Sequence, residues 1–317
     1  MELIGGLVLQ GFQMLVVLAL APGLSGLVRK LKARLMRRRG ASVAQPYRDL
    51  VRLMKKDVVL AENASWLFRV SPYMIFAATW VAAALVPTFA IGLQFSWTAD
   101  LIAIVALLGS ARFFLALAGM DVGTSFGGIG ASREMMIGAL AEPAMLLMVF
   151  TVALVAGSTQ LSNVVAFMAS GEVGIRISMG MALIALIIVA IAENARIPVD
   201  NPATHLELTM VHEAMVLEYS GRHLAMIELA AALKLLLYVA LIGCVFVPWG
   251  IAPSTAGGGL VLGFGFFVLK LAAGGAMLAV FETSIAKMRV FRVPDFLGVA
   301  LMLGLLGTLL LFVSRSL

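Results

Sequence analysis

Runs of about 18 or more apolar residues recur along the whole of this 317-residue chain, and they restrict what it can fold into. A helix needs about 20 apolar residues to cross a bilayer. Hydrophobic residues make up 62% of the chain and charged residues only 13%, unlike a soluble domain. A transmembrane barrel would show short alternating segments instead. The sequence therefore predicts an all-α polytopic membrane protein.

Eight transmembrane spans are predicted, and residues 1–317 form a single integral membrane domain. The spans are Leu3–Val28, Val70–Gly92, Leu101–Gly119, Met135–Gly157, Ile177–Ala195, Leu224–Val247, Gly257–Phe281 and Phe296–Ser314. Lys and Arg gather on one side of these spans, where 18 of the 23 basic residues lie. Cytoplasmic loops carry such an excess, so both termini are predicted outside the cell. The cytoplasmic loops are then about 29–69, 120–134, 196–223 and 282–295.

The first of these loops contains an amphipathic helix. Its apolar residues recur at helical spacing: Tyr47, Leu50, Val51, Met54 and Val58. This helix is expected on the membrane surface or against a partner protein, and lipid headgroup attraction alone would also explain its basic face. The net charge of +6 follows from the asymmetry of the loops, so it does not indicate a nucleic-acid partner.

The stretch Glu193–Gly221 is a charged loop between two spans. It contributes to a group of five glutamates, Glu193, Glu207, Glu213, Glu218 and Glu228. Further charges fall within spans or at their rims: Arg112, Asp121, Glu142, Lys234, Lys270 and Glu282. Each costs about 2.5–3.5 kcal/mol at a helix centre, so each needs a partner or water. They either fix the helix register as buried ion pairs or form a proton or ion path.

Spacing along one helix does not pair these charges. Residues three or four apart face each other on a helix. Glu228 and Lys234 are six residues apart, and Arg112 and Asp121 are nine residues apart, so their partners are expected on other helices. The single cysteine, Cys244, leaves no cysteine cluster for a metal. The three histidines, His205, His212 and His223, are interpreted as ordinary loop histidines. No metal ligand set or catalytic constellation is found, and the chain is expected to be non-catalytic alone.

The loop residues resemble subunit 1 of respiratory complex I. The run Glu193–Asp200 and the later Glu218-Tyr219-Ser220-Gly221 are similar to that subunit's third cytoplasmic loop. The segment ARFFLALAGMDVGTSFGGIGASREMMIGALAEP (Ala111–Pro143) is more similar to the membrane anchor subunit of formate hydrogenlyase and energy-converting [NiFe] hydrogenases. That branch is a sister of the complex I subunit.

The resemblance implies a multi-pass subunit of the cell inner membrane that joins a cytoplasmic redox module to antiporter-like membrane subunits. Its partners would be hydrogenase-like large and small subunits, which would carry iron–sulfur clusters and a NiFe centre where activity is retained. No cofactor is expected in this chain. The implied proton or ion path comprises Glu142, Glu193, Glu207, Glu213, Glu218, Glu228, Lys234 and Lys270. The implied loop signature and module-docking residues are Arg133, Arg196, Pro198, Asp200, Arg48 and Asp49.

Two departures distinguish this chain from typical complex I. Ala203, Thr204 and His205 stand where the family often has further acids, and the interval up to Glu218 is three residues longer. Both argue against a standard quinone chamber. Three hypotheses remain: an ion-coupling subunit of a hydrogenase-like complex, the quinone-site subunit of a complex-I-like dehydrogenase, and a purely structural anchor.

Overall fold

The computed structural model describes residues 2–170, 177–200, 210–252, 259–286, 288 and 290–316. This part of the chain is built from helices, joined by loops with two isolated β-bridges. The helices are α1 (Glu2–Leu35), α2 (Gln45–Met54), α3 (Trp66–Leu85), α4 (Leu101–Asp121), α5 (Ser125–Ala156), α6 (Leu161–Ala169), α7 (Ile177–Glu193), α9 (His212–Val216), α10 (Gly221–Val245), α11 (Gly259–Ser284), the 3₁₀ turn η1 (Val290–Arg292) and α12 (Val293–Ser316).

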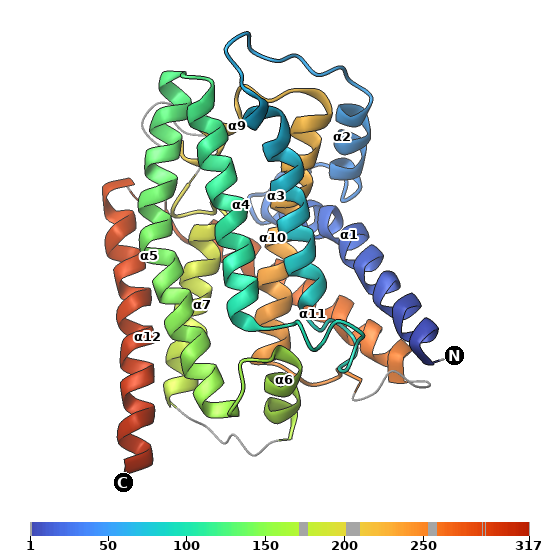
Figure 1. Ribbon diagram of the computed structural model, residues 1–317, viewed down its shortest axis with the longest axis vertical. Coiled ribbons are helices and arrows are strands. Elements are labelled where there is room, and N and C mark those ends of the chain that lie inside the picture. Colours follow the sequence, from blue (N-terminus) through green and yellow to red (C-terminus); the bar gives the residue numbers. More distant parts are fainter. Residues whose placement is uncertain are drawn as a thin grey trace.

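Seven of the described helices are long and apolar enough to cross a membrane, namely α1, α3, α4, α5, α10, α11 and α12. The shorter α7 is also apolar and has 17 described residues, about the minimum for a span. The prediction of an all-α polytopic membrane protein is confirmed. Figure 1 shows both termini in the lower part of the molecule, away from α2 and α9, as an even number of crossings requires.

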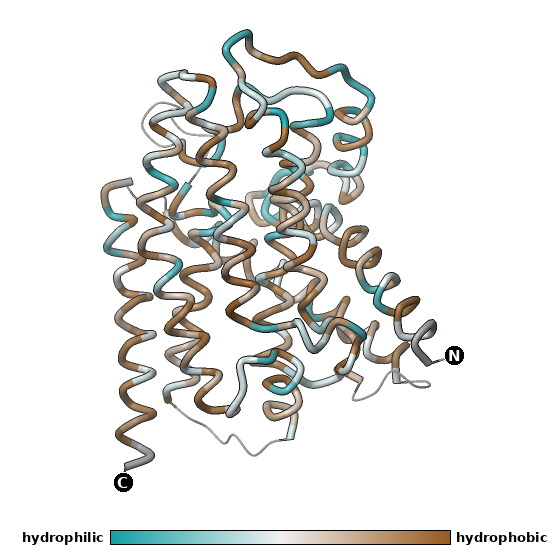
Figure 2. The backbone as a smooth tube through the Cα atoms, in the orientation of Figure 1, coloured by the Kyte–Doolittle hydropathy of each residue, from teal (hydrophilic) through white to brown (hydrophobic). Residues whose placement is uncertain are grey.

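The helices form one bundle with α10 near its centre (Figure 1). α10 packs on α1, α3 and α11, and α12 packs on α5 and α7 along the other side. Side chains of α10 fill the core, among them Leu233, Leu236 and Tyr238. Figure 2 shows hydrophobic residues along the middle of the long helices and hydrophilic ones in the loops around α2.

Helix boundaries differ from the sequence prediction at the second cytoplasmic connection. The expected loop 120–134 is mostly helical, because α4 ends at Asp121 and α5 already begins at Ser125. Thr124 caps α5 by accepting a hydrogen bond from the Gly127 amide at 3.2 Å, and Gly123 takes the left-handed conformation (φ 72°) that the tight turn requires. The polar segment before Met135 is therefore a helical extension of the span.

The amphipathic helix of the first loop is α2, with Pro46 in its first turn. It packs on α1 and α10, and the Tyr47 hydroxyl donates a hydrogen bond to the Ala19 carbonyl of α1. Val51 and Met54 remain exposed on its other side. α2 thus covers one flank of the bundle and leaves an apolar strip for a membrane surface or a partner.

At the opposite end of the bundle, Asp100 joins two connections. One carboxylate oxygen accepts from the Ile102 amide at 2.7 Å and caps α4, and the other accepts from the Thr159 hydroxyl at 2.5 Å. Leu101 and Leu161 add backbone hydrogen bonds between the same two segments. Asp100 therefore fixes the start of α4 against the start of α6.

We expect Asp100→Ala to destabilise the protein by about 1 kcal/mol, because the cap and the bond to Thr159 are both lost. Asp100→Asn keeps a capping oxygen and should lose less. The midpoint of thermal unfolding in detergent measures the difference. An Ala variant as stable as the Asn variant would show that the cap contributes nothing here.

Candidate functional site

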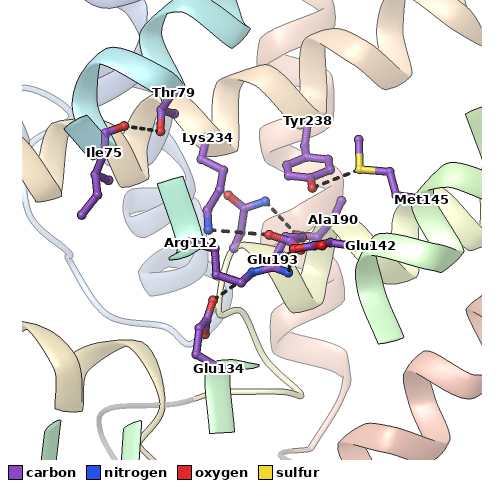
Figure 3. Close-up of polar contacts among 11 residues, drawn as sticks. Ile75, Thr79, Arg112, Glu134, Glu142, Met145, Ala190, Glu193, Lys234 and Tyr238 are labelled. Carbon is purple, nitrogen blue, oxygen red and sulfur yellow. Dashed lines mark hydrogen bonds and ion pairs between the residues drawn. The ribbon is translucent and has the colours of Figure 1, made fainter. Parts of the chain in front are cut away.

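A buried arginine, Arg112 of α4, lies at the centre of a group of charges drawn from four helices (Figure 3). Its guanidinium lies 3.4 Å from Glu134 and 2.9 Å from Glu142, both on α5. It also pairs with Glu193 at the end of α7. Lys234 of α10 approaches Glu193 from the other side at 3.8 Å. We call these five residues the Arg112 cluster.

The spacing of the glutamates along α5 and two glycines allow the Arg112 guanidinium to lie between α4 and α5. Glu134 and Glu142 are eight residues apart on α5, about two turns, so both face α4. Gly138 lies midway between them, and a Cβ atom there would stand 2.5 Å from an Arg112 nitrogen. A Cβ at Gly109 of α4 would meet a Glu142 oxygen at 3.3 Å. The two glycines leave the room that the guanidinium and Glu142 occupy.

The charges in the Arg112 cluster do not balance. Three carboxylates face two cations, so one negative charge is left over when all five groups are ionised. Four side chains are largely buried, whereas the Glu142 side chain is 45% exposed. In a low-dielectric interior an uncompensated charge is costly, and it is lowest in energy where water or a partner can reach it. Glu142 is that position.

Glu142 opens into a groove between α4 and α5 of about 460 Å³. The groove is lined mainly by apolar residues, including Ile102, Phe113 and Leu146. Its charged lining residues are Arg112 and Glu142. We call it the α4–α5 groove. It brings the cluster to the lateral surface of the bundle.

A second and larger cavity of about 560 Å³ lies on the α2 side. It is enclosed by α1, α2, α9, α10, the end of α11 and the segment after α7. Its charged lining residues come from all of these elements: Arg29, Lys32, Asp49, Arg52, Arg196, Asp200, Glu213, Glu228 and Glu282. We call it the polar cavity.

Ion pairs hold the wall of the polar cavity. Glu282 of α11 accepts from Lys32 of α1 at 2.9 Å and lies 3.5 Å from Arg196. Burial lowers the pKa of Arg196, and the charge of Glu282 opposes this shift. The Asp200 carboxylate accepts from the amides of Val211 and His212, both at 3.2 Å, which sets the start of α9. The segment after α7 is thereby tied to α1, α9 and α11.

Acidic groups meet on the floor of the polar cavity. Burial raises the pKa of Glu213, and the charges of Glu228 and Asp200 raise it further. A carboxyl group in this environment takes up a proton more readily than one in water. His212, next to Glu213, also lines the cavity and lies within electrostatic reach of Lys234 and Glu134. The polar cavity therefore borders the Arg112 cluster.

The structure separates the residues that the sequence assigned to a path. Glu142, Glu193 and Lys234 lie in the Arg112 cluster, and Glu213 and Glu228 line the polar cavity. Glu218 is exposed after α9. Lys270 lies apart on α11, with its ammonium 3.4 Å from the Gly243 carbonyl. Glu207 lies outside the described residues.

Some of the residues that the resemblance implies for the loop signature and for module docking line the polar cavity, and others do not. Arg196, Asp200 and Asp49 line it, and Arg48 is exposed on α2. Pro198 is buried and its carbonyl accepts from the Met288 amide at 3.1 Å. Arg133 donates to the Met210 carbonyl at 2.9 Å and so joins α5 to the start of α9. Asp121 accepts from the Ser65 amide at 2.8 Å, outside the cluster.

Two features of the Arg112 cluster are not predicted from the sequence: the presence of Glu134 and the partners of Arg112. Glu134 does not stand out as a charge within a span, because the predicted fourth span begins at Met135, one residue later. Its position two turns before Glu142 was a usable signal, since a helix extended by three turns puts both acids on one face. No comparable signal pairs Arg112 with Glu193, which depends on how α4 and α7 pack.

Comparison with known proteins places these features in a family. The NADH dehydrogenase family profile matches residues 9–313. Formate hydrogenlyase subunit 4 of Escherichia coli K12 is 36% identical over 89% of this chain and 91% of that protein. Hydrogenase-4 component C of the same organism is 32% identical over 87% of each. A chain of the membrane-bound sulfane sulfur reductase, an archaeal respiratory membrane complex, has a TM-score of 0.79 at 19% identity, covering 96% of this chain and 99% of that one.

Arg112→Met should destabilise the protein by about 3–5 kcal/mol, because it leaves three carboxylates, two of them buried, facing one cation. Adding Glu193→Gln removes one of those charges and should restore part of the loss. The midpoint of thermal unfolding in detergent is the measurement, and Arg48→Met on the exposed face of α2 is the matched control. If Arg112→Met melts with the control, the cluster does not hold the four helices together.

Proposed function

The chain belongs to the NADH dehydrogenase family, that of complex I subunit 1, and from this premise we propose that it is a membrane subunit of a formate-hydrogenlyase-like, group 4 [NiFe] hydrogenase complex. It anchors a cytoplasmic redox module and couples electron transfer in that module to proton or sodium translocation. The two Escherichia coli relatives, matched over nearly their whole length, support this assignment. The chain itself carries no redox chemistry in this proposal.

The observation that carries the proposal is the position of the Arg112 cluster between two cavities. The polar cavity lies on the loop side, and the α4–α5 groove opens to the side of the bundle. A purely structural ion pair would be served by balanced and fully enclosed charges. This cluster instead keeps an extra carboxylate and leaves it half exposed.

Electrostatics would pass free energy through this arrangement. A change of charge in the redox module acts first on the groups of the polar cavity and its loop, such as Glu213 and Glu228. Two unit charges 4 Å apart interact by about 4 kcal/mol at an effective dielectric constant of 20. Such an interaction changes the occupancy of a neighbouring carboxylate by a proton or sodium ion, and Glu142 is the member open to exchange.

The partners follow from the same proposal. Hydrogenase-like large and small subunits would dock on the polar face formed by α2 and the loop after α7. Antiporter-like membrane subunits would lie beside the bundle. Iron–sulfur clusters, and a NiFe centre where hydrogenase activity is retained, would belong to those partners.

A quinone site is the second candidate, and the volume of the polar cavity favours it. A cavity of about 560 Å³ lies within the range that holds small organic ligands. The lining of the cavity disfavours a quinone, because pockets for such ligands are predominantly apolar and charged residues from all the surrounding elements line this one. Binding of a quinone analogue to a catalytically competent complex, lost on Glu228→Leu, would support the quinone assignment.

Glu142→Gln is expected to weaken ion-gradient formation strongly in sealed vesicles while the redox reaction in detergent continues. The amide keeps the size of the side chain and one oxygen that can accept from Arg112, but it cannot exchange a proton. The measurement is the number of ions moved per electron transferred. Glu62→Gln, in an exposed loop, is the matched control. Coupling equal to that of the control would favour the structural-anchor hypothesis.

Orientation gives a separate prediction, namely that the α2 side faces the cytoplasm and the termini face outward. Trp97 and Trp249 are exposed at the other end, as expected for an aromatic belt. In a Cys244→Ala background, Trp97→Cys should react with an impermeant maleimide on intact cells. Ala41→Cys, in the first loop, should react only after permeabilisation. Labelling of Ala41→Cys on intact cells, with Trp97→Cys labelled only after permeabilisation, would show that the α2 side faces outward and would contradict the proposed orientation.

A further inference from the structure

His212, the first residue of α9, lies where the polar cavity borders the Arg112 cluster. It lines the cavity, and the charges that act on it from neighbouring helices are Lys234 of α10 and Glu134 of α5. Asp200, in the segment after α7, accepts from the His212 amide, and Glu213 follows His212 in α9. His212 is thus placed between the larger cavity and two members of the cluster.

The backbone, rather than the side chain, holds His212 in place. Its amide donates to Asp200, and Arg133 holds the Met210 carbonyl two residues earlier. α9 is packed so tightly on α5 that a Cβ atom at Gly130 would stand 2.9 Å from Met215 and from the Val211 carbonyl. In the part of the chain that the structure describes, the imidazole makes no hydrogen bond, and His212 lines the polar cavity, where a ring nitrogen can bond to water.

The local field keeps the imidazole neutral. Burial and, to a smaller extent, the charge of Lys234 lower the pKa of His212, and Glu134 opposes the shift; together they bring it to about 4. A neutral imidazole carries one donor and one acceptor nitrogen at the same time. It can therefore take a proton on one side while it gives one on the other.

We propose that His212 transfers protons between the polar cavity and the Arg112 cluster, an inference that rests on the proposed function. A proton from cavity water binds the free ring nitrogen. The proton on the other nitrogen then passes to the Glu134 carboxylate, directly or through one water. The imidazole returns to the neutral form with its tautomer exchanged, and a ring rotation or the reverse transfer restores it. No electron moves and no group is consumed, so the step needs no further reactant.

The test uses the intact complex in sealed vesicles and measures protons moved per electron transferred. His212→Gln should lower this ratio about tenfold or more, the scale of losing a positioned acid–base group. His212→Ala should lose as much, and imidazole in the buffer should restore part of the ratio, because the vacated space opens on a cavity of about 560 Å³. The control is His223→Gln, a histidine that packs against Tyr219 and Tyr73 and does not line the cavity.

The outcomes separate this inference from the proposed function. Normal coupling in His212→Gln together with impaired coupling in Glu142→Gln would overturn the role of His212 alone. Normal coupling in both would overturn the proposed function. Impaired coupling in His212→Ala without any rescue by imidazole would show a structural role and reject proton transfer. Failure of both His212→Gln and His212→Ala to assemble would also assign His212 to folding and overturn the proposal.

Discussion

The packing of this bundle depends on one cation, the guanidinium of Arg112, that has been placed inside a membrane helix. A charge there is unfavourable by several kcal/mol unless counter-charges surround it. Carboxylates from α5 and α7 supply them, and Lys234 brings α10 to the same point. Four helices thus share one charged centre. Because helix contacts in lipid lack a hydrophobic driving force, this centre fixes how the four helices register with one another.

The same centre connects the two cavities, which lie on different sides of it. Charges in the polar cavity are attached to segments that a soluble partner would touch, namely α2 and the loop after α7. Glu142 is exposed on the side of the bundle. The low-dielectric protein between the two cavities strengthens electrostatic interactions across the cluster. In the proposed coupling, a docking event or a change of redox state would act on the carboxylate at the opposite cavity without a large movement of the backbone.

The long apolar runs predicted the fold class, and the helical spacing of apolar residues predicted the amphipathic α2, because both are local properties of the sequence. Glu142, Glu193 and Lys234 were identifiable as candidates since charges are rare in spans. Their joint pairing with Arg112 was not, because it depends on how distant helices cross. The start of α5 was placed about ten residues too late, since apolar content marks the bilayer and not the end of the helix. That shift hid Glu134. The sequence indicated only an ordinary loop histidine at His212, because nothing in its neighbouring sequence reveals that α9 folds back onto α5.

Arginine at the centre also determines how the cluster can work. A guanidinium does not release its proton in proteins, so no proton passes through Arg112 itself. It can instead transmit a change of charge from one carboxylate to another. In the proposed coupling, a proton delivered to Glu134 would weaken its interaction with Arg112, and the guanidinium would interact more strongly with Glu142. Arg112 would thus link the polar-cavity side of the cluster to the α4–α5 groove without itself gaining or losing a proton. A side chain at Gly138 would displace the guanidinium, because a Cβ atom there would stand 2.5 Å from an Arg112 nitrogen, and we expect this link to fail.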